Sequence, residues 1–369
     1  MGLLGEAKRL VVKVGSALLV GEDGAIDQPW LAALCEDVAH HRRAGRDVIL
    51  VTSGAIAVGR RPLGLKPGPL RLDEKQAAAA TGQIRLAHAY QQELARHDIA
   101  CAQILVTIDD TENRRRFLNA RNTLETLLRL GAVPVINEND TVATQEIRFG
   151  DNDRLAARVA QMIGADTLVL LSDIDGLYTA DPRKDPNARF IEDVRDLTPE
   201  IEAMAGDPTS AVGTGGMVTK LQAAKIALGA GCRMAIAPGK PLHPLRTMES
   251  GRCTWFHPRQ TPQTARKSWI AGSIKPQGRL TVDSGAAAAL AKGGSLLPAG
   301  IVEIDGQFQK GDAVSVLGPD GRDLARGLAA YGAEEARRLK GRKSGDFENL
   351  LGYRGPDEMI HRDDLVLTA

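Results

Sequence analysis

The sequence predicts an α/β fold, a parallel-sheet αβα sandwich, followed by a second, smaller and mostly β domain. Within residues 1–260, short runs rich in β-branched residues alternate with longer stretches rich in Ala, Leu, Glu, Gln and Arg. Continuous apolar strands that alternate with helices are typical of a parallel sheet covered on both faces. Beyond residue 278, short strands alternate with Gly-rich turns instead. A length of 369 residues also favours two domains over one.

The apolar runs predict six strands in the first domain, at residues 10–15, 47–54, 102–107, 132–137, 167–173 and 233–239. Helices are predicted at residues 28–44, 74–97, 112–130, 152–164 and 217–229. One helix is predicted in the second domain, at 286–292. Residues 258–278 contain three prolines and few apolar residues. We therefore expect a linker at 261–277, between a domain of residues 1–260 and a domain of residues 278–369.

Composition excludes several classes of function. The 47 basic and 46 acidic side chains leave a net charge of +1, which removes any global argument for binding nucleic acid or an anionic membrane. The four cysteines form no CxxC pair, so we expect a reduced cytoplasmic protein without structural zinc. The N-terminal residues do not resemble a signal peptide, and no apolar run is long enough to span a bilayer.

Polar residues follow the predicted strands at the point where each strand ends. Ligands of parallel α/β sheets bind beyond these carboxyl ends, where the loops gather. The densest polar segment is residues 134–153, and no core could bury so many amides and carboxylates without partners. Its polar residues are Asn137, Glu138, Asn139, Asp140, Asp151, Asn152 and Asp153. Residues 151–153 are also suited to capping the helix that follows them, and oxygen ligands of this kind suit Mg²⁺ better than zinc.

Two lysines lie where an anion could meet them. Lys13 interrupts an apolar strand, which is costly unless its ammonium reaches an anion or the strand lies at a solvated edge. Residues 210–220 place three glycines before a helix predicted to begin near Met217, with Lys220 in its first turn. Glycines and a helix N-terminus can hold a phosphate, although a Gly-rich loop without a ligand would have the same composition. Because Thr219 precedes Lys220, this segment is not a Walker loop.

Together these features favour phosphoryl transfer, which needs positioning and neutralisation of charge more than covalent chemistry from the protein. Ser53 has no G-x-S-x-G elbow around it, so it fits anion binding better than nucleophilic attack. None of the histidines has the spacing of metal ligands. The basic run at residues 114–116 is typical of a solvated helix face, with a partner contact as the alternative.

The sequence resembles the glutamate 5-kinase family of the amino acid kinase superfamily, whose members carry a C-terminal PUA domain. The likeness runs through nearly the whole chain and keeps the expected order and spacing. It is carried by the segments VVKVGS, VILVTSGAIAVG, RRFLNARNTL, VPVINENDTVAT, FGDND, LSDIDGLYTADPR, GTGGMVTKLQAA and HRDDLVL. Departures are small: Ser172 stands where threonine is common, and Thr141 and Gln145 vary.

The resemblance implies that ATP phosphorylates L-glutamate to L-glutamyl 5-phosphate, the first step of proline biosynthesis. It implies catalytic roles for Lys13, Asp153 and Lys220, in which Asp153 orients the two lysines. Glutamate would be bound by Ser53, Asp140 and Asn152, with residues 141–151 as a candidate lid. ATP would be bound by Lys13, Gly15, Ser172, Asp173, Thr214, Gly215, Gly216, Met217, Val218, Thr219 and Lys220.

The resemblance also implies ATP and Mg²⁺ as cofactors, proline as feedback inhibitor and a homo-oligomer such as a tetramer, with no membrane partner. The PUA domain would bind RNA or have a structural or regulatory role. Two alternatives remain at this point. One is another kinase of the superfamily, acting on aspartate, N-acetylglutamate, carbamate or UMP. The other is an RNA-binding protein led by its PUA domain, which intact Lys13, Asp153 and Lys220 argue against.

Overall fold

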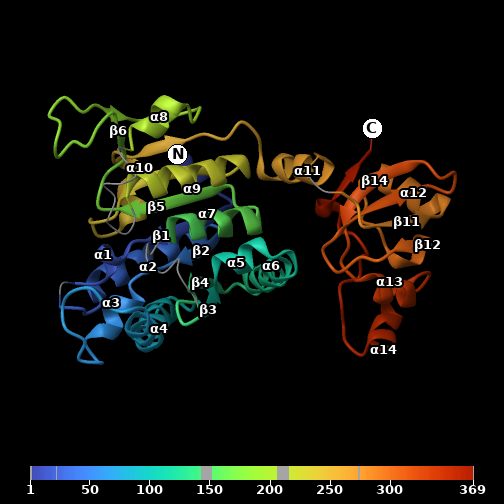
Figure 1. The fold of residues 1–369 in the computed structure, drawn as a ribbon, viewed down its shortest axis with the longest axis horizontal. Helices are drawn as coiled ribbons and strands as arrows, with labels where there is room; N and C mark the ends of the chain where they lie inside the picture. Colours follow the sequence, from blue (N-terminus) through green and yellow to red (C-terminus); the bar gives the residue numbers. More distant parts are fainter. Residues whose placement is uncertain (1, 22, 143–151, 206–215, 273–274, 369) are drawn as a thin grey trace. The chain divides into compact units, whose positions relative to one another are not determined.

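The computed structural model describes residues 2–21, 23–142, 152–205, 216–272 and 275–368. The chain divides into two compact units, Met1–Pro262 and Gln263–Ala369 (Figure 1). The first unit contains an eight-stranded sheet and the second a five-stranded sheet. The predicted fold class, an αβα sandwich followed by a smaller unit built on a separate sheet, is therefore confirmed.

All six strands predicted in the first domain are present in its sheet, whose strand order is β3-β4-β2-β1-β5-β9-β10-β8. They pair in parallel, and β10 runs antiparallel to β9 at one side of the sheet. Their bounds are β1 (Arg9–Val14), β2 (Asp47–Val51), β3 (Cys101–Val106), β4 (Val133–Glu138), β5 (Thr167–Ser172), β8 (Asp193–Val194), β9 (Arg233–Pro238) and β10 (Thr254–Phe256). Because β1 lies between β2 and β5, it is a central strand.

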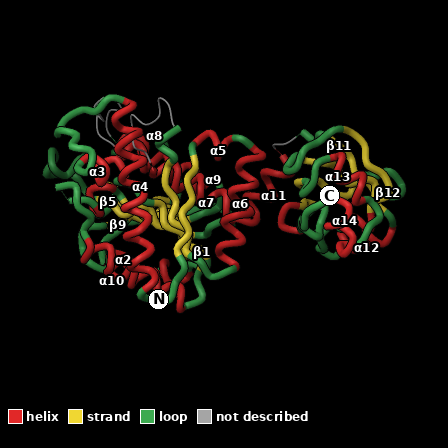
Figure 2. The backbone as a smooth tube through the Cα atoms, turned by 90° about the horizontal axis from the view of Figure 1, so that it is seen from below, coloured by secondary structure: helices red, strands yellow, loops and turns green. Residues whose placement is uncertain are grey.

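Helices cover both faces of this sheet. The five long ones are α2 (Gln28–Arg43), α4 (Leu72–Ala95), α6 (Arg114–Arg129), α7 (Asn152–Ile163) and α9 (Met217–Gly229). Alternate residues of β1 face opposite sides: Val12 packs in a cluster with residues of α2 and α4, and Val11 packs in a cluster with residues of α6, α7 and α9. Figure 2 shows the strands between these two groups of helices. Burial on both faces explains why the strands are continuously apolar.

The sequence pattern missed the short elements of the first unit, because a few residues show no periodicity. Besides β8 and β10, they are η1 (Leu3–Glu6), α1 (Ser16–Leu19), α3 (Ala55–Arg60), α5 (Ile108–Glu112), β6 (Leu177–Tyr178), β7 (Phe190–Ile191), α8 (Pro199–Ala203) and α10 (Pro244–Ser250). The helices α3 and α4 approach each other with no space for a side chain. A Cβ atom on Gly59 would lie 1.8 Å from the carbonyl oxygen of Ala78, and one on Gly82 would lie 1.8 Å from that of Ala55.

The second unit is built on a sheet of order β12-β11-β13-β14-β15. Its strands are β11 (Gly278–Val282), β12 (Ile301–Gly306), β13 (Ala313–Leu317), β14 (Asp323–Leu328) and β15 (Leu365–Leu367). Its helices are α12 (Ser284–Ala291), which matches the predicted one, α13 (Ala333–Leu339) and α14 (Phe347–Leu351), with short 3-10 turns η4 (Pro298–Gly300), η5 (Ser344–Asp346) and η6 (Arg362–Asp364).

The segment expected as a linker contains a helix, α11 (Pro262–Gly272). Its Ile270 is fully buried and packs with Ala313 and Leu328 of the second unit. Arg266 forms an ion pair with Asp364 of the same unit. Pro262 begins this helix, and the prolines at residues 258 and 276 flank it. Three prolines in this segment are therefore compatible with a helix.

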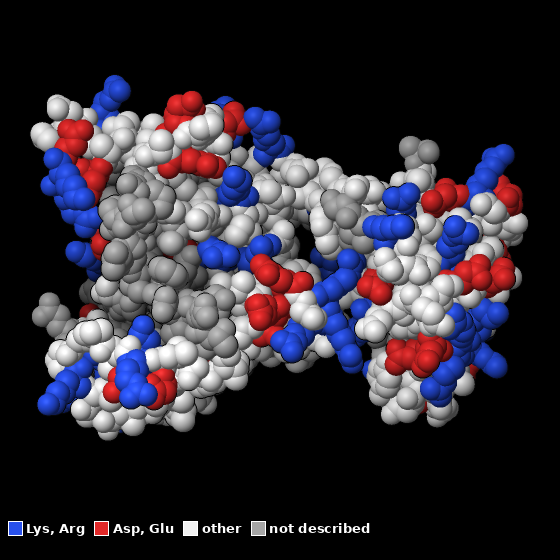
Figure 3. Space-filling model, in the orientation of Figure 1, with Lys and Arg blue, Asp and Glu red and all other residues white. Residues whose placement is uncertain are grey.

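Among the described residues, no helix combines the length and the apolar character that a bilayer span requires. On the face drawn in Figure 3, acidic and basic side chains are interspersed on both units, in keeping with the net charge of +1.

Candidate functional site

Lys13 lies in the central strand of the first unit, so its ammonium cannot reach solvent at a sheet edge. It is paired with Val51 of β2 and Leu170 of β5, and only 6% of the residue is exposed. Its Nζ lies 2.6 Å from Oδ1 of Asp153. Of the two explanations for this lysine, the structure therefore supports the one in which it meets an anion.

Asp153 lies at the start of α7 and is completely buried. Besides Lys13 it meets Lys220 of α9, whose Nζ lies 3.1 Å from Oδ2 of Asp153 and which is 4% exposed. Burial by itself would raise the pKa of the Asp153 carboxyl, but the ammonium groups of Lys13 and Lys220 outweigh it and hold that pKa below its ordinary value. We call these three residues the ion triad. With all three ionised, the ion triad carries one positive charge more than its own carboxylate balances.

The start of α9 lies beside the ion triad. Gly216 is its N-cap residue and offers no side chain to the free backbone N–H groups of the first turn. Thr219 lies in that turn, with Oγ1 at 2.8 Å from the Gly216 carbonyl oxygen and 3.2 Å from Oδ2 of Asp153. An uncapped helix N-terminus next to a buried lysine is suited to binding an anion such as phosphate.

The carboxyl ends of β1 and β5 contribute a glycine backbone and a polar side chain to the same region. Gly15 follows β1, and a Cβ atom placed on it would lie 4.0 Å from Nζ of Lys13, so its backbone borders the ion triad. Ser172 ends β5 and is buried, and its hydroxyl donates to Asp173, which is exposed. The predicted residues Thr214, Gly215 and Asp151, and most of the candidate lid, lie outside the described residues.

Asn152 joins two strand ends, those of β2 and β4, through its amide. Its Nδ2 lies 2.6 Å from the Thr52 carbonyl oxygen, 2.9 Å from Oγ of Ser53 and 2.9 Å from Oδ1 of Asn137. The amide nitrogen has two hydrogens for these three acceptors, so it has none left for a ligand. In the part of the chain that the structure describes, Oδ1 of Asn152 has no partner. Asn152 therefore has one group left for a ligand, and that group is an acceptor.

Asp140 follows β4, on the same carboxyl edge of the sheet. It is partly buried, and burial raises the pKa of its carboxyl to about 6. Among the described residues no ion pair offsets this burial. Burial away from a cation destabilises a carboxylate, and a cationic group of a ligand would stabilise it.

Sequence reasoning missed the residues that support this arrangement. Gln83 of α4 accepts from Nδ2 of Asn137 at 2.7 Å, and the hydroxyl of Tyr90, also of α4, lies 3.1 Å from Oγ1 of Thr52. Both side chains are buried. A single Gln or Tyr in an Ala-rich helix does not reveal in the sequence that it forms such a hydrogen bond, because its partner lies at the end of a strand far away in sequence.

Comparison with known proteins shows the family of the chain. The sequence model of the amino acid kinase family matches residues 8–238, and that of the PUA domain matches residues 278–351. Glutamate 5-kinase of Paramagnetospirillum magneticum is 67% identical over 369 residues, which cover 100% of both chains. This chain belongs to the glutamate 5-kinase family. Family members from Rhodospirillum rubrum and Agrobacterium fabrum are 65% and 59% identical, over 97% and 98% of this chain and 96% and 93% of theirs.

The predicted residues that the structure describes thus gather at one edge of the sheet of the first unit. Lys13, Asp153 and Lys220 form one contact network, and Ser53 and Asn152 form another. Asn152 and Asp153 are consecutive in α7, so the two networks adjoin. No group of three or more His, Cys, Asp or Glu side chains placed to hold a metal occurs among the described residues.

Proposed function

We propose that this chain transfers the γ-phosphoryl group of ATP to the γ-carboxylate of L-glutamate, giving L-glutamyl 5-phosphate and ADP, as the first step of proline biosynthesis. The observation that carries the proposal is the buried ion triad, in which two lysines meet one carboxylate, in a member of the glutamate 5-kinase family. Other carboxylate kinases of the superfamily are not favoured, since the relatives match over the whole chain, including the PUA domain.

The reaction brings together two anions and needs no general base. The γ-carboxylate of glutamate, with a pKa of about 4.3, is already ionised at neutral pH. The barrier lies in the repulsion between this carboxylate and the phosphates. We propose that Lys13 and Lys220 neutralise that charge in the transition state, and that Asp153 holds both ammonium groups in place before the substrates arrive. Fixed charges in a site without water act more strongly than the same charges in solution.

The ATP phosphates would bind at the start of α9 and beside Gly15. The free N–H groups after Gly216 and the backbone of Gly15 both border the lysines of the ion triad. Ser172 and Asp173, at the end of β5, and the segment Thr214–Lys220 complete the predicted nucleotide site. Mg²⁺, when bound, would add positive charge at the phosphates. Since the described side chains provide no group of three metal ligands, we propose that it is held chiefly by the nucleotide.

The groups left free near Asn152 suit glutamate. At neutral pH the α-ammonium is the only hydrogen-bond donor of glutamate, and the carboxylate of Asp140 and Oδ1 of Asn152 are both acceptors. We propose that these two bind the α-ammonium. The hydroxyl of Ser53, which accepts from Asn152, keeps its own hydrogen free to donate to a substrate carboxylate.

The remaining predictions concern regulation and partners. We expect proline to inhibit by competing at the glutamate site, the chain to form a homo-oligomer such as a tetramer, and the protein to act in the cytoplasm. For the PUA domain, RNA binding and a structural or regulatory role are both retained as predictions. Inhibition assays with proline, light scattering and a binding assay with labelled RNA test these points separately.

The decisive experiment is ATP-dependent formation of the hydroxamate, with L-glutamate compared against aspartate and N-acetylglutamate. We expect turnover with L-glutamate far above that with either competitor. Folded protein that shows no turnover with glutamate in the presence of Mg²⁺ would contradict the proposal. Turnover with another acceptor instead would assign the chain to that substrate.

A further inference from the structure

A chain of buried side-chain amides connects helix α4 with the proposed glutamate site. Oε1 of Gln83 accepts from Nδ2 of Asn137 at 2.7 Å, and Oδ1 of Asn137 accepts from Nδ2 of Asn152 at 2.9 Å. All three residues are buried. Each amide thus turns its nitrogen toward the next oxygen, so the chain has a direction from Asn152 to Gln83.

Backbone groups fix this direction. The N–H of Glu138 can only donate, and it donates to Oδ1 of Asn137 at 2.9 Å. The carbonyl of Thr52 can only accept, and it accepts from Nδ2 of Asn152 at 2.6 Å. With the orientation of Asn137 and Asn152 set in this way, Oε1 of Gln83 is the acceptor that satisfies the remaining hydrogens of Asn137. If Asn152 were turned over, its oxygen would face the Thr52 carbonyl oxygen and the bond would be lost.

Helix α4 holds both neighbours of Asn152 at once. Gln83 bonds to Asn137, and Tyr90, two helical turns further along the same face, bonds to Thr52. The position of α4 is itself set by the contact of Gly82 with α3, which leaves no room for a Cβ atom. The amide chain is therefore supported by rigid elements and not by loops.

We propose that Gln83 and Asn137 are positioning residues that decide which atom Asn152 presents to the amino-acid substrate. They hold its nitrogen inside the protein and leave its carbonyl oxygen to accept from the α-ammonium. This inference rests on the proposed function, in which Asn152 binds glutamate. Its consequence is specificity. An acylated nitrogen has lost its charge and two of its hydrogens, so the two acceptors that we propose for the α-ammonium, Asp140 and Asn152, disfavour N-acylated glutamate.

The test removes the acceptor at the end of the chain. Gln83→Met keeps nearly the same length but leaves Nδ2 of Asn137 without a partner. We expect KM for L-glutamate to rise about tenfold, the effect of about one buried hydrogen bond, with KM for ATP and kcat within about twofold. The preference for L-glutamate over N-acetylglutamate should fall as well. The matched control is Gln92→Met, the same substitution at an exposed position of the same helix, which should change none of these values.

Rescue by Gln83→Glu, which keeps an oxygen opposite Asn137, should give a smaller rise in KM than Gln83→Met. If folded Gln83→Met has the KM and the substrate preference of the unmodified protein, the positioning role is overturned while the proposed function stands. Absence of glutamate turnover in the unmodified protein would overturn the proposed function itself.

If Gln83→Met does not fold, the pair Asn137→Leu and Asn137→Asp gives the same comparison. Leucine offers Asn152 no acceptor and should raise KM at least about tenfold, whereas aspartate still accepts and should raise it several times less. Equal KM values for these two variants would overturn the inference.

Discussion

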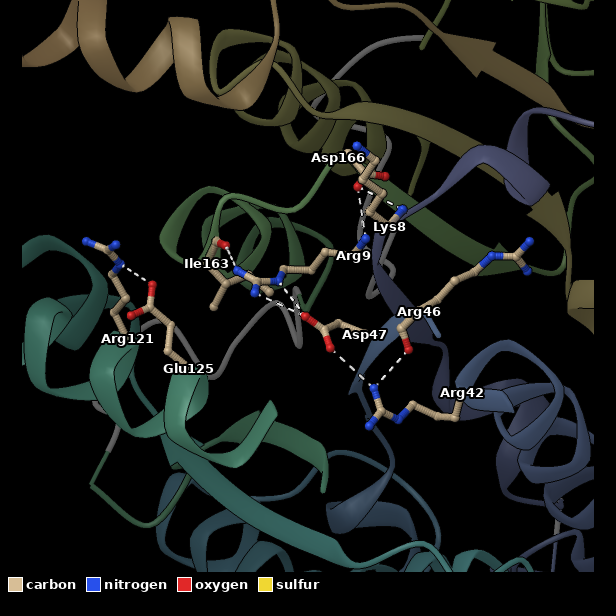
Figure 4. A network of polar contacts seen from close by, with 9 residues as sticks. All are labelled: Lys8, Arg9, Arg42, Arg46, Asp47, Arg121, Glu125, Ile163 and Asp166. Atoms are coloured by element: carbon tan, nitrogen blue, oxygen red, sulfur yellow. Dashed lines mark hydrogen bonds and ion pairs between the residues drawn. The ribbon is translucent and has the colours of Figure 1, made fainter. Parts of the chain in front are cut away.

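The two ends of the same sheet carry similar charged clusters that differ in their access to water. At the amino ends, Asp47 is bound by Arg9 and Arg42, and Asp166 accepts from the backbone N–H groups of Lys8 and Arg9 (Figure 4). There each carboxylate meets donors of the protein itself. At the carboxyl ends, one carboxylate faces two ammonium groups and is buried with them. In both clusters two cationic side chains meet one carboxylate, and the difference is that Asp47 is partly exposed whereas Asp153 is completely buried.

Burial makes this difference large in energy. The side chains of Arg9 and Asp47 are 29% and 28% exposed, and an ion pair with that access to water contributes about 0–1 kcal/mol. The side chain of Asp153 is 0% exposed, and removing one partner from a buried pair costs about 3–5 kcal/mol. Equivalent substitutions at the two ends should therefore have very different effects.

The largest effect is expected for Asp153→Ala, which removes the buried carboxylate that Lys13 and Lys220 share. Activity should fall at least about tenfold in kcat, because the lysines lose their fixed positions. The free energy of unfolding should fall by about 3–5 kcal/mol. Steady-state kinetics and chemical denaturation measure the two quantities. Unchanged kcat in this variant would remove Asp153 from the proposed mechanism.

Lys220→Ala should lower kcat at least about tenfold as well, because one charge that opposes the repulsion of the substrates is lost. Stability should change less than in Asp153→Ala, since Lys13 still pairs with Asp153 at 2.6 Å. This variant separates catalysis from folding in the ion triad. A loss of stability as large as that of Asp153→Ala, with kcat preserved, would instead indicate a structural role.

Acid should weaken glutamate binding through Asp140, whose pKa burial raises to about 6. The ionised carboxylate is the form that binds an ammonium, so KM for glutamate should rise as pH falls through about 6, with KM for ATP much less affected. Asp140→Asn should have a raised KM at neutral pH and should lose this pH dependence. Measuring KM between pH 5 and pH 8, in both proteins, tests the role of Asp140.

The smallest effect is expected at the amino ends. Asp47→Ala also removes a carboxylate. However, Asp47 is partly exposed and is the first residue of β2, at the opposite end of the sheet from the ion triad. The free energy of unfolding should fall by about 1 kcal/mol and kcat should stay within about twofold. A loss of activity comparable to that of Asp153→Ala would mean that the two ends of the sheet do not differ as we infer.

The sequence predicted the framework of the site better than its support. Continuous apolar runs identify strands buried on both faces, and a lysine within such a run, as Lys13 is, must meet an anion or solvent. The anion itself could be recognised only through the family resemblance, since Asp153 is distant in sequence. Gln83 and Tyr90 were not predictable, because hydrogen bonds between a helix and a strand leave no periodic pattern. Helix α11 could not be predicted in this way, because prolines at the start of a helix and prolines in irregular chain look alike in sequence.

The contact of Gly59 with Gly82 affects how substitutions at these two positions should be interpreted. A methyl group at either position would meet backbone atoms at 1.8 Å, so α3 and α4 would have to separate. Gln83 and Tyr90 would move with α4, although neither glycine touches the ion triad or Asn152 in any contact described above. A variant that only replaces one hydrogen by a methyl group, at a residue remote from the chemistry, would then show weaker affinity for the amino acid. Tolerance to substitution here is set by the closeness of two backbones.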